Sequence, residues 1–231
     1  MVAHLAAPRR PLSGGHAWTW RPDEPWFRLY HHDDRTPDAL APRRYGPLLR
    51  FDPHTPPPDA PADCPAGRTV IYLARTLRTA GAEVFGDLRE AALCPRYRAA
   101  LVRPSEATMI QNVRRAGSMA IGALPALSTA DLPRAETQAW ARAIYEDRPA
   151  HRDVAGIRYT GAHDEGDALV LWDTAPSLAL VQDAPVRDPA VLRRFLVVMS
   201  RLQVAVSLID AAECRRCLAA EERRGWARAD P

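Results

Sequence analysis

The sequence contains no lysine, and all 31 of its basic residues are arginines. Every permanently cationic side chain is therefore a planar guanidinium, a group well suited to binding phosphate. GC-rich coding explains this bias at least as well as a functional need does, so the bias alone assigns no function. The net charge of +3 is small, and no basic run or aromatic–basic repeat accompanies it. A nucleic-acid binder is therefore the least favoured class, and we expect no direct nucleic-acid partner.

Long apolar runs and the common nucleotide-binding motifs are also absent. The most apolar stretch, FLVVMSRLQVAVSLI, is interrupted by Arg201 and Gln203 and is too short to span a membrane. The N-terminus lacks the charge order of a secretory signal. No GxGxxG, P-loop or GxSxG motif occurs, which removes the usual support for a Rossmann fold, a nucleotide triphosphatase or an α/β-hydrolase. We expect a cytoplasmic protein without a membrane partner.

Cysteine is scarce, and the sequence gives weak support for a metal site. Of the four cysteines, Cys214 and Cys217 form one CxxC motif without a second pair, which favours ordinary reduced thiols over a zinc site. The segments HHDD at 31–34 and HDEGD at 163–167 contain potential ligands, but both are predicted to be solvated turns. We therefore expect no metal.

The length and the hydrophobic patterns predict one domain with extensions. Residues 1–24 show no periodicity and are expected to form a flexible arm. Residues 25–187 combine alternating strand patterns with amphipathic helix patterns, which predicts an α+β fold with a mixed sheet and flanking helices. Residues 188–231 are predicted to be a helical extension. Its apolar stripe, Val191–Ile209, is too wide for a lone surface helix, so it should pack on the domain or on a second copy; we favour a homodimer.

The expected strands, each rich in β-branched or aromatic residues, are PWFRLYHHDD, TVIYLA, ATMIQNV, AGIRYTG and DALVLWDTA. RAETQAWARAIYED is predicted to be an amphipathic helix. The segment PHTPPPDAPADCPAG is expected to be a surface insertion and a candidate lid, because proline lacks the backbone donor that sheets and helices need.

Glu83 is the most unusual residue of the pattern. The strand TVIYLA leads into a helix that Thr76 can cap, and Glu83 lies at the edge of this helix's buried stripe. It follows Ala80, Gly81 and Ala82, small residues that leave room for another backbone or a ligand.

The segments RFDP, GRTVIYLARTLRTAGAEVFG, TQAWARAI and AGIRYTG resemble the RES domain, over roughly residues 26–182. The most specific feature is a Glu eleven residues after the strand Tyr, here Glu83 after Tyr72. The resemblance implies an α+β fold similar to that of ADP-ribosyltransferases. Arg28 and Arg50 match the family's arginines, and Thr160 stands where the family has its Ser. This Thr keeps the hydroxyl but adds a methyl group.

The resemblance also implies a function, because the family includes the toxins of RES–Xre toxin–antitoxin modules. We expect an enzyme that consumes NAD by cleaving its nicotinamide–ribose bond through hydrolysis or phosphorolysis. An ADP-ribosyltransferase acting on a protein and a non-catalytic RES-like binding protein remain alternatives. The implied catalytic residues are Glu83 and Arg28, and the implied substrate-binding residues are Arg50, Tyr72 and Thr160. An Xre-type helix-turn-helix antitoxin is the implied protein partner.

Overall fold

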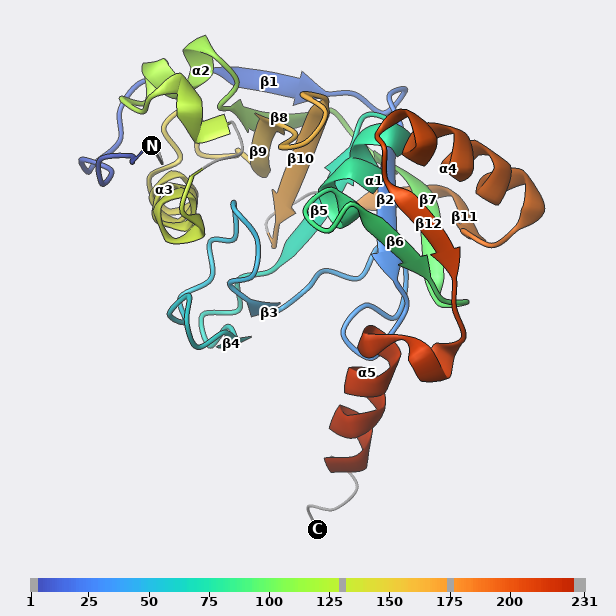
Figure 1. Ribbon diagram of the computed structural model, residues 1–231. Coiled ribbons are helices and arrows are strands. Elements are labelled where there is room, and N and C mark those ends of the chain that lie inside the picture. Colours follow the sequence, from blue (N-terminus) through green and yellow to red (C-terminus); the bar gives the residue numbers. More distant parts are fainter. Residues whose placement is uncertain (1–3, 129–131, 174–176, 227–231) are drawn as a thin grey trace.

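The computed structural model describes residues 4–128, 132–173 and 177–226. Its centre is a curled eight-stranded sheet with the strand order β1-β8-β9-β10-β5-β2-β7-β11 (Figure 1). The strands are β1 (Ala17–Trp20), β2 (Trp26–His31), β5 (Val70–Ala74), β7 (Tyr97–Pro104), β8 (Thr108–Asn112), β9 (Gly156–Thr160), β10 (Asp167–Trp172) and β11 (Leu178–Pro185). Neighbouring strands are antiparallel except β8 and β9, which are parallel.

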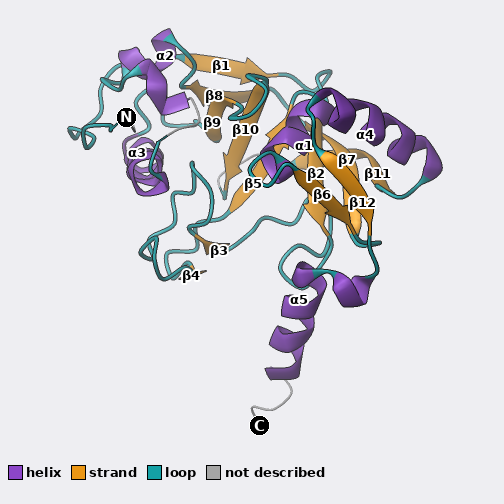
Figure 2. Cartoon of the chain, viewed as in Figure 1, coloured by secondary structure: helices purple, strands orange, loops and turns teal. Residues whose placement is uncertain are grey.

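Several helices accompany this mixed sheet, which confirms the predicted α+β class (Figure 2). They are α1 (Leu77–Phe85), α2 (Ala116–Ala120), α3 (Arg134–Asp147), α4 (Pro189–Arg201) and α5 (Arg215–Trp226), with 3₁₀ turns at Pro125–Ser128 and Ala211–Glu213. Two small sheets complete the described fold: β6 (Glu90–Leu93) pairs in parallel with β12 (Ala205–Leu208), and β3 (Tyr45–Gly46) pairs with β4 (Ala62–Asp63). Within the described ranges, no helix is both long enough and apolar enough to cross a membrane.

Strand β5 and helix α1 form as the sequence predicts. Along β5, Tyr72 packs on the core beneath α3, whereas Ile71 and Leu73 pack on the opposite face of the sheet. This is the two-residue alternation of a strand buried on both sides. Thr76 caps α1, because its side chain accepts a hydrogen bond from the Thr79 amide at 3.1 Å.

Helix α1 lies where the two halves of the sheet meet. Strand β2 pairs with β7 along its whole length but pairs with β5 at one position, Phe27 opposite Ala74. Helix α1 contacts both β2 and β5 and so covers this junction. Helix α4 then packs on the outside of α1, burying Phe195 and Met199 completely.

The expectation of a loose N-terminal arm is wrong for its structured part. Residues 17–20 form β1 at one edge of the main sheet, and Trp20 is fully buried. Leu5 and Leu12 are also buried, and Arg10 forms ion pairs with Glu146 and Asp147 of α3. The segment shows no periodicity because its buried apolar residues are isolated from one another along the chain, and each contacts the domain separately.

The C-terminal extension is helical only in part. Helix α4 ends at Arg201, and β12 then adds a parallel strand to β6. The four residues of β12 are largely β-branched or small, and their pairing with a distant strand overrides the helical period of the sequence. In the Pro-rich insertion, Ala62 and Asp63 form the short strand β4.

Candidate functional site

The candidate site is a cleft of about 220 Å³ between α1, the start of α3 and the β9–β10 turn. It combines two acids, two arginines, a histidine and two tyrosines with apolar residues. The lining residues are Leu49, Arg50, Tyr72, Glu83, Val84, Asp87, Leu132, Arg134, Tyr159, Ala162 and His163. Three of the five residues that the resemblance implies, Arg50, Tyr72 and Glu83, therefore lie together.

Two donors hold the Glu83 carboxylate. Its Oε1 accepts a hydrogen bond from the Ala162 backbone N–H at 2.7 Å, and its Oε2 accepts one from the Tyr159 hydroxyl at 3.0 Å. Gly161 leaves room for this contact, because a Cβ there would lie 3.3 Å from Oε1. Each oxygen keeps a further lone pair, so the carboxylate is oriented yet can still accept bonds from a ligand.

The β9–β10 turn is joined to α1 at a second point. The Thr79 hydroxyl donates to Asp164 at 2.9 Å, and the Asp164 side chain is almost fully buried. The expectation of a solvated turn is thus wrong at Asp164. These two connections fix the side of the cleft on which Glu83 lies.

Two tyrosine–carboxylate pairs, Tyr159 with Glu83 and Tyr72 with Asp52, extend from the cleft into the core. The ring of Tyr159 lies edge-on to that of Tyr72, with centroids 6.5 Å apart. The Tyr72 hydroxyl donates to Asp52 at 2.8 Å, and Arg43 also binds this fully buried Asp52. Burial raises the pKa of both tyrosines well above 10, and the adjacent carboxylates act in the same direction. Both hydroxyls therefore stay protonated donors at neutral pH.

Arg50 extends along the cleft wall beside these tyrosines. Its guanidinium carbon lies 5.2 Å from the centre of the Tyr159 ring, and its Nη2 donates to the Thr160 carbonyl at 3.2 Å. The ring and the carbonyl fix the direction of the guanidinium, which remains partly exposed.

A second cationic group lies at the cleft's outer edge. The exposed Asp87 contacts both Arg134, at 3.2 Å, and His163, at 3.2 Å. Exposed ion pairs of this kind contribute little to the free energy of unfolding. A charged ligand can therefore displace one partner at little cost.

The structure does not bring Arg28 to this cleft. Arg28 is buried on β2, and its guanidinium donates to the carbonyls of Ala39 at 2.6 Å and Ala41 at 2.8 Å. Burial lowers its pKa to about 10, so it still carries its charge at neutral pH. In this arrangement Arg28 holds the 38–41 loop against the sheet.

Thr160 borders the cleft only through its backbone. Its hydroxyl accepts a bond from Arg114 Nε at 3.3 Å, and it is not among the lining residues. Successive strand side chains point to opposite faces, so Tyr159 enters the cleft while Thr160 faces Arg114.

The small residues before Glu83 have a packing role. A Cβ on Gly81 would lie 2.2 Å from the terminal methyl of Met199 in α4, and Ala80 and Ala82 are buried. Gly81 therefore admits helix α4, on the side of α1 away from the cleft, and does not make room for a ligand.

Several residues that line the cleft or lie behind it were not expected from the sequence. Tyr159 and Asp52 both lie inside the quoted segments AGIRYTG and RFDP, so a search for buried polar partners there was the available signal. Arg134 carries no such signal, and His163 was considered only as a potential metal ligand in HDEGD, because only the tertiary fold places these two exposed side chains at the rim.

The family model of the RES domain matches residues 20–193 of this chain. No curated protein and no solved structure matched the chain in the other two comparisons. The matched segment contains strands β2 to β11, α1 with Glu83, and every residue that lines the cleft. The chain therefore belongs to the RES domain family.

Proposed function

We propose that this protein is a RES-type NAD-consuming enzyme that cleaves the nicotinamide–ribose bond of NAD by hydrolysis or phosphorolysis. The observation that carries the proposal is the Glu83 carboxylate, which is oriented by Tyr159 and Ala162 and lies at a cleft with Arg50 and Tyr72. Family membership supports an NAD-related domain of the toxin type.

The proposed reaction breaks the bond between the ribose C1′ and the pyridinium nitrogen. The bonding electrons leave with the nitrogen, which becomes neutral nicotinamide, and positive charge develops on the ribose. An oxygen of water or phosphate then bonds to C1′ and releases a proton to solvent. A fixed carboxylate beside the ribose stabilises the cationic transition state more than the neutral ribose of the substrate.

Arg50 and Tyr72 would bind the rest of the substrate. A guanidinium pairs with a pyrophosphate through charge-assisted hydrogen bonds, and an aromatic ring can stack on a nicotinamide or an adenine. The cleft volume of about 220 Å³ is below the ~300–1,000 Å³ typical of small-molecule pockets. It suits the nicotinamide riboside end of a dinucleotide, with the remainder lying over the rim near Arg134.

Glu83→Gln tests the proposal directly. The variant keeps the shape of Glu83 but loses its charge, so we expect NAD consumption at saturating substrate to fall ~100- to 1,000-fold with little change in affinity. The matched control is Glu106→Gln, at an exposed position on another part of the chain. Rates are measured with and without phosphate, and the products are separated by chromatography, which distinguishes ADP-ribose from its phosphorylated counterpart.

A purified parent protein that consumes no NAD under either condition would contradict the proposal. So would a Glu83→Gln protein that melts like the parent and retains its rate. Induced expression in bacteria adds a test of the toxin assignment: the parent should deplete cellular NAD and stop growth, and Glu83→Gln should do neither.

A further inference from the structure

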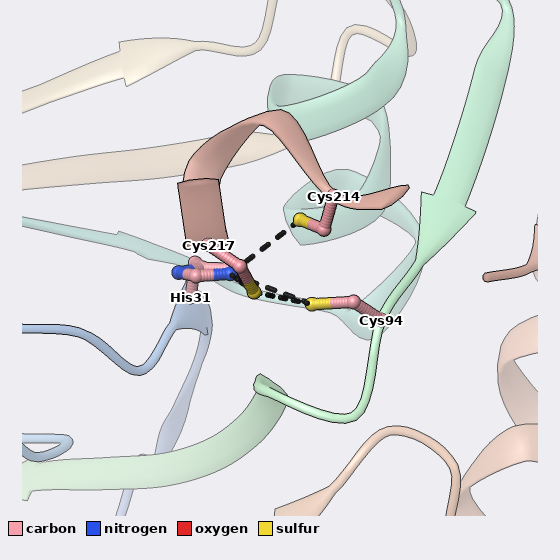
Figure 3. A group of neighbouring side chains, drawn as sticks. All are labelled: His31, Cys94, Cys214 and Cys217. Atoms are coloured by element: carbon pink, nitrogen blue, oxygen red, sulfur yellow. Dashed lines mark hydrogen bonds between the residues drawn. The ribbon is translucent and has the colours of Figure 1, made fainter. Parts of the chain in front are cut away.

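Four potential metal ligands, none of which lines the cleft, meet in the interior of the protein. His31 ends strand β2, Cys94 follows β6, and Cys214 and Cys217 flank the start of α5 (Figure 3). Their ligand atoms all lie within 4.8 Å of one another, and all four side chains are buried. We propose that these residues bind a structural Zn²⁺ ion in tetrahedral coordination.

The Cys94–Cys217 distance and the three distances from His31 Nε2 are close to those of a zinc tetrahedron. With Zn–S near 2.3 Å and Zn–N near 2.05 Å, tetrahedral angles place two sulfurs ~3.8 Å apart and a sulfur ~3.5 Å from the nitrogen. The Cys94 and Cys217 sulfurs are 3.6 Å apart. His31 Nε2 lies 3.4 Å from Cys94, 3.4 Å from Cys217 and 3.8 Å from Cys214. A disulfide needs about 2.05 Å between sulfurs and leaves two ligands unused, so it explains the group less well.

The direction of His31 supports the same interpretation. Its Nε2 points at the three sulfurs, as Figure 3 shows, while its Nδ1 lies 3.3 Å from the Asp33 carboxylate. A carboxylate on the far nitrogen is the usual arrangement for a zinc-bound histidine, because it fixes the tautomer and the ring orientation. The edge of Tyr97 packs against the imidazole at 5.2 Å between ring centres, which restricts it further.

The chemistry of the ligand set selects zinc among the common metals. Three thiolates and one imidazole form a tetrahedral Cys₃His site, which suits Zn²⁺ and leaves no open position for a substrate. Binding displaces the three thiol protons to solvent and leaves the site with one net negative charge. The proposed role is therefore structural and does not depend on the proposed NAD chemistry.

The ion would join the family domain to the C-terminal extension. His31 and Cys94 lie within the matched residues 20–193, whereas Cys214 and Cys217 lie beyond them. Helix α5 projects from the lower end of the molecule in Figure 1, and the CxxC motif spans its start. A zinc ion there would fix the start of α5 to the ends of β2 and β6.

The test uses the full chain, purified under reducing conditions without chelator, and elemental analysis by mass spectrometry. We expect about one zinc per chain in the parent. Cys217→Ser should lose zinc and melt at a lower temperature. Cys64→Ser is the matched control, because Cys64 is buried but lies outside the group, and it should keep its zinc.

A second measurement does not depend on the folding of a variant. The parent is stripped with a chelator and titrated with Co²⁺, for which we expect one saturating equivalent with the intense visible bands and thiolate charge-transfer bands of a tetrahedral site. A folded parent that carries no zinc and takes up neither Zn²⁺ nor Co²⁺ would overturn the proposal. Zinc retained by a folded Cys217→Ser protein, or a cobalt spectrum without thiolate bands, would overturn it too.

Discussion

Arg50 and Arg134 are the guanidinium groups among the described residues that line the cleft. Arg50 is held by an aromatic ring and a backbone carbonyl, whereas Arg134 is more than half exposed and paired with Asp87. An ordered cation loses less conformational entropy on binding an anion than a mobile one does. Arg50 should therefore contribute more than Arg134 to binding a pyrophosphate.

Arg50→Ala should weaken NAD binding about 10- to 100-fold, the usual effect of losing a charge-assisted hydrogen bond of ~1.5–3 kcal/mol. Calorimetry on the inactive Glu83→Gln background measures this without turnover. Arg152→Ala is the control, because the Arg152 side chain is 89% exposed and pairs only weakly with its neighbour Asp153. Equal NAD affinities in the two variants would contradict the assignment of Arg50 to the NAD-binding site.

Tyr159 gives a prediction about alkaline pH. Its pKa is raised well above 10 in the folded protein, so its contribution to stability is complete below about pH 10 and is lost as the pH rises towards the folded value. We expect the melting temperature to fall above pH 10 and to fall less steeply in Tyr159→Phe. Melting curves from pH 8 to pH 11 measure the slope, and identical slopes in parent and variant would contradict the assignment.

At the scale of elements, the contact between α1 and α4 depends on Gly81 and Met199. Gly81→Leu would push a side chain into the space of Met199, and overpacking of this kind costs ~1–3 kcal/mol of unfolding free energy. Met199→Ala should cost ~2–5 kcal/mol by opening a cavity. The double variant should lose less than the sum, because the leucine fills that cavity; denaturant unfolding of all four proteins measures the coupling. Strict additivity would show that the two positions do not share space.

The elements that the sequence predicted best are those whose local pattern agrees with their burial. Strand β5, the Thr76 cap and helix α3 follow directly from alternation, a capping side chain and a helical period. Strands β1 and β12 were missed, because each depends on pairing with a distant segment, β8 and β6 respectively. Such pairings leave little trace in a four-residue pattern.

The candidate site was predictable to a similar extent. The resemblance gave Glu83, Arg50 and Tyr72, which do meet at the cleft, but it also gave Arg28, whose strand carries it elsewhere. The CxxC motif was interpreted as two ordinary thiols, because its partners His31 and Cys94 lie more than 100 residues away in sequence. A ligand set assembled from three separate segments is visible only after folding.

At the scale of the whole molecule, the C-terminal extension is part of the core. Phe195 and Met199 pack in one cluster with Phe85 and Tyr97, and β12 pairs with β6. Removing residues 188–231 deletes several buried side chains, each worth ~2–5 kcal/mol, from a protein whose total stability is of order 5–15 kcal/mol. We expect an aggregated or molten product, and circular dichroism with light scattering measures it. Removing only residues 227–231 is the control, and a folded, soluble 1–187 fragment would contradict the prediction.

The homodimer stays a prediction. Packing of α4 on α1 covers one face of the predicted apolar stripe, while Leu196 and Val197 remain 43% and 49% exposed. Val197→Arg should convert a dimer formed through this face into a monomer, because association would then bury an unpaired charge. Sedimentation at several concentrations measures the mass, and a parent that is monomeric throughout would dismiss the dimer.

The order of strands in the main sheet has a consequence for synthesis on the ribosome. Strand β5 is made early, but its long partner in the sheet is β10, and β9 also needs β10. Strand β1 likewise waits for β8, almost a hundred residues later. The nascent chain must therefore expose unpaired strand edges until Trp172 has left the exit tunnel, the period in which chaperones bind such edges. A translational pause shortly before β10 should therefore lower the yield of folded protein.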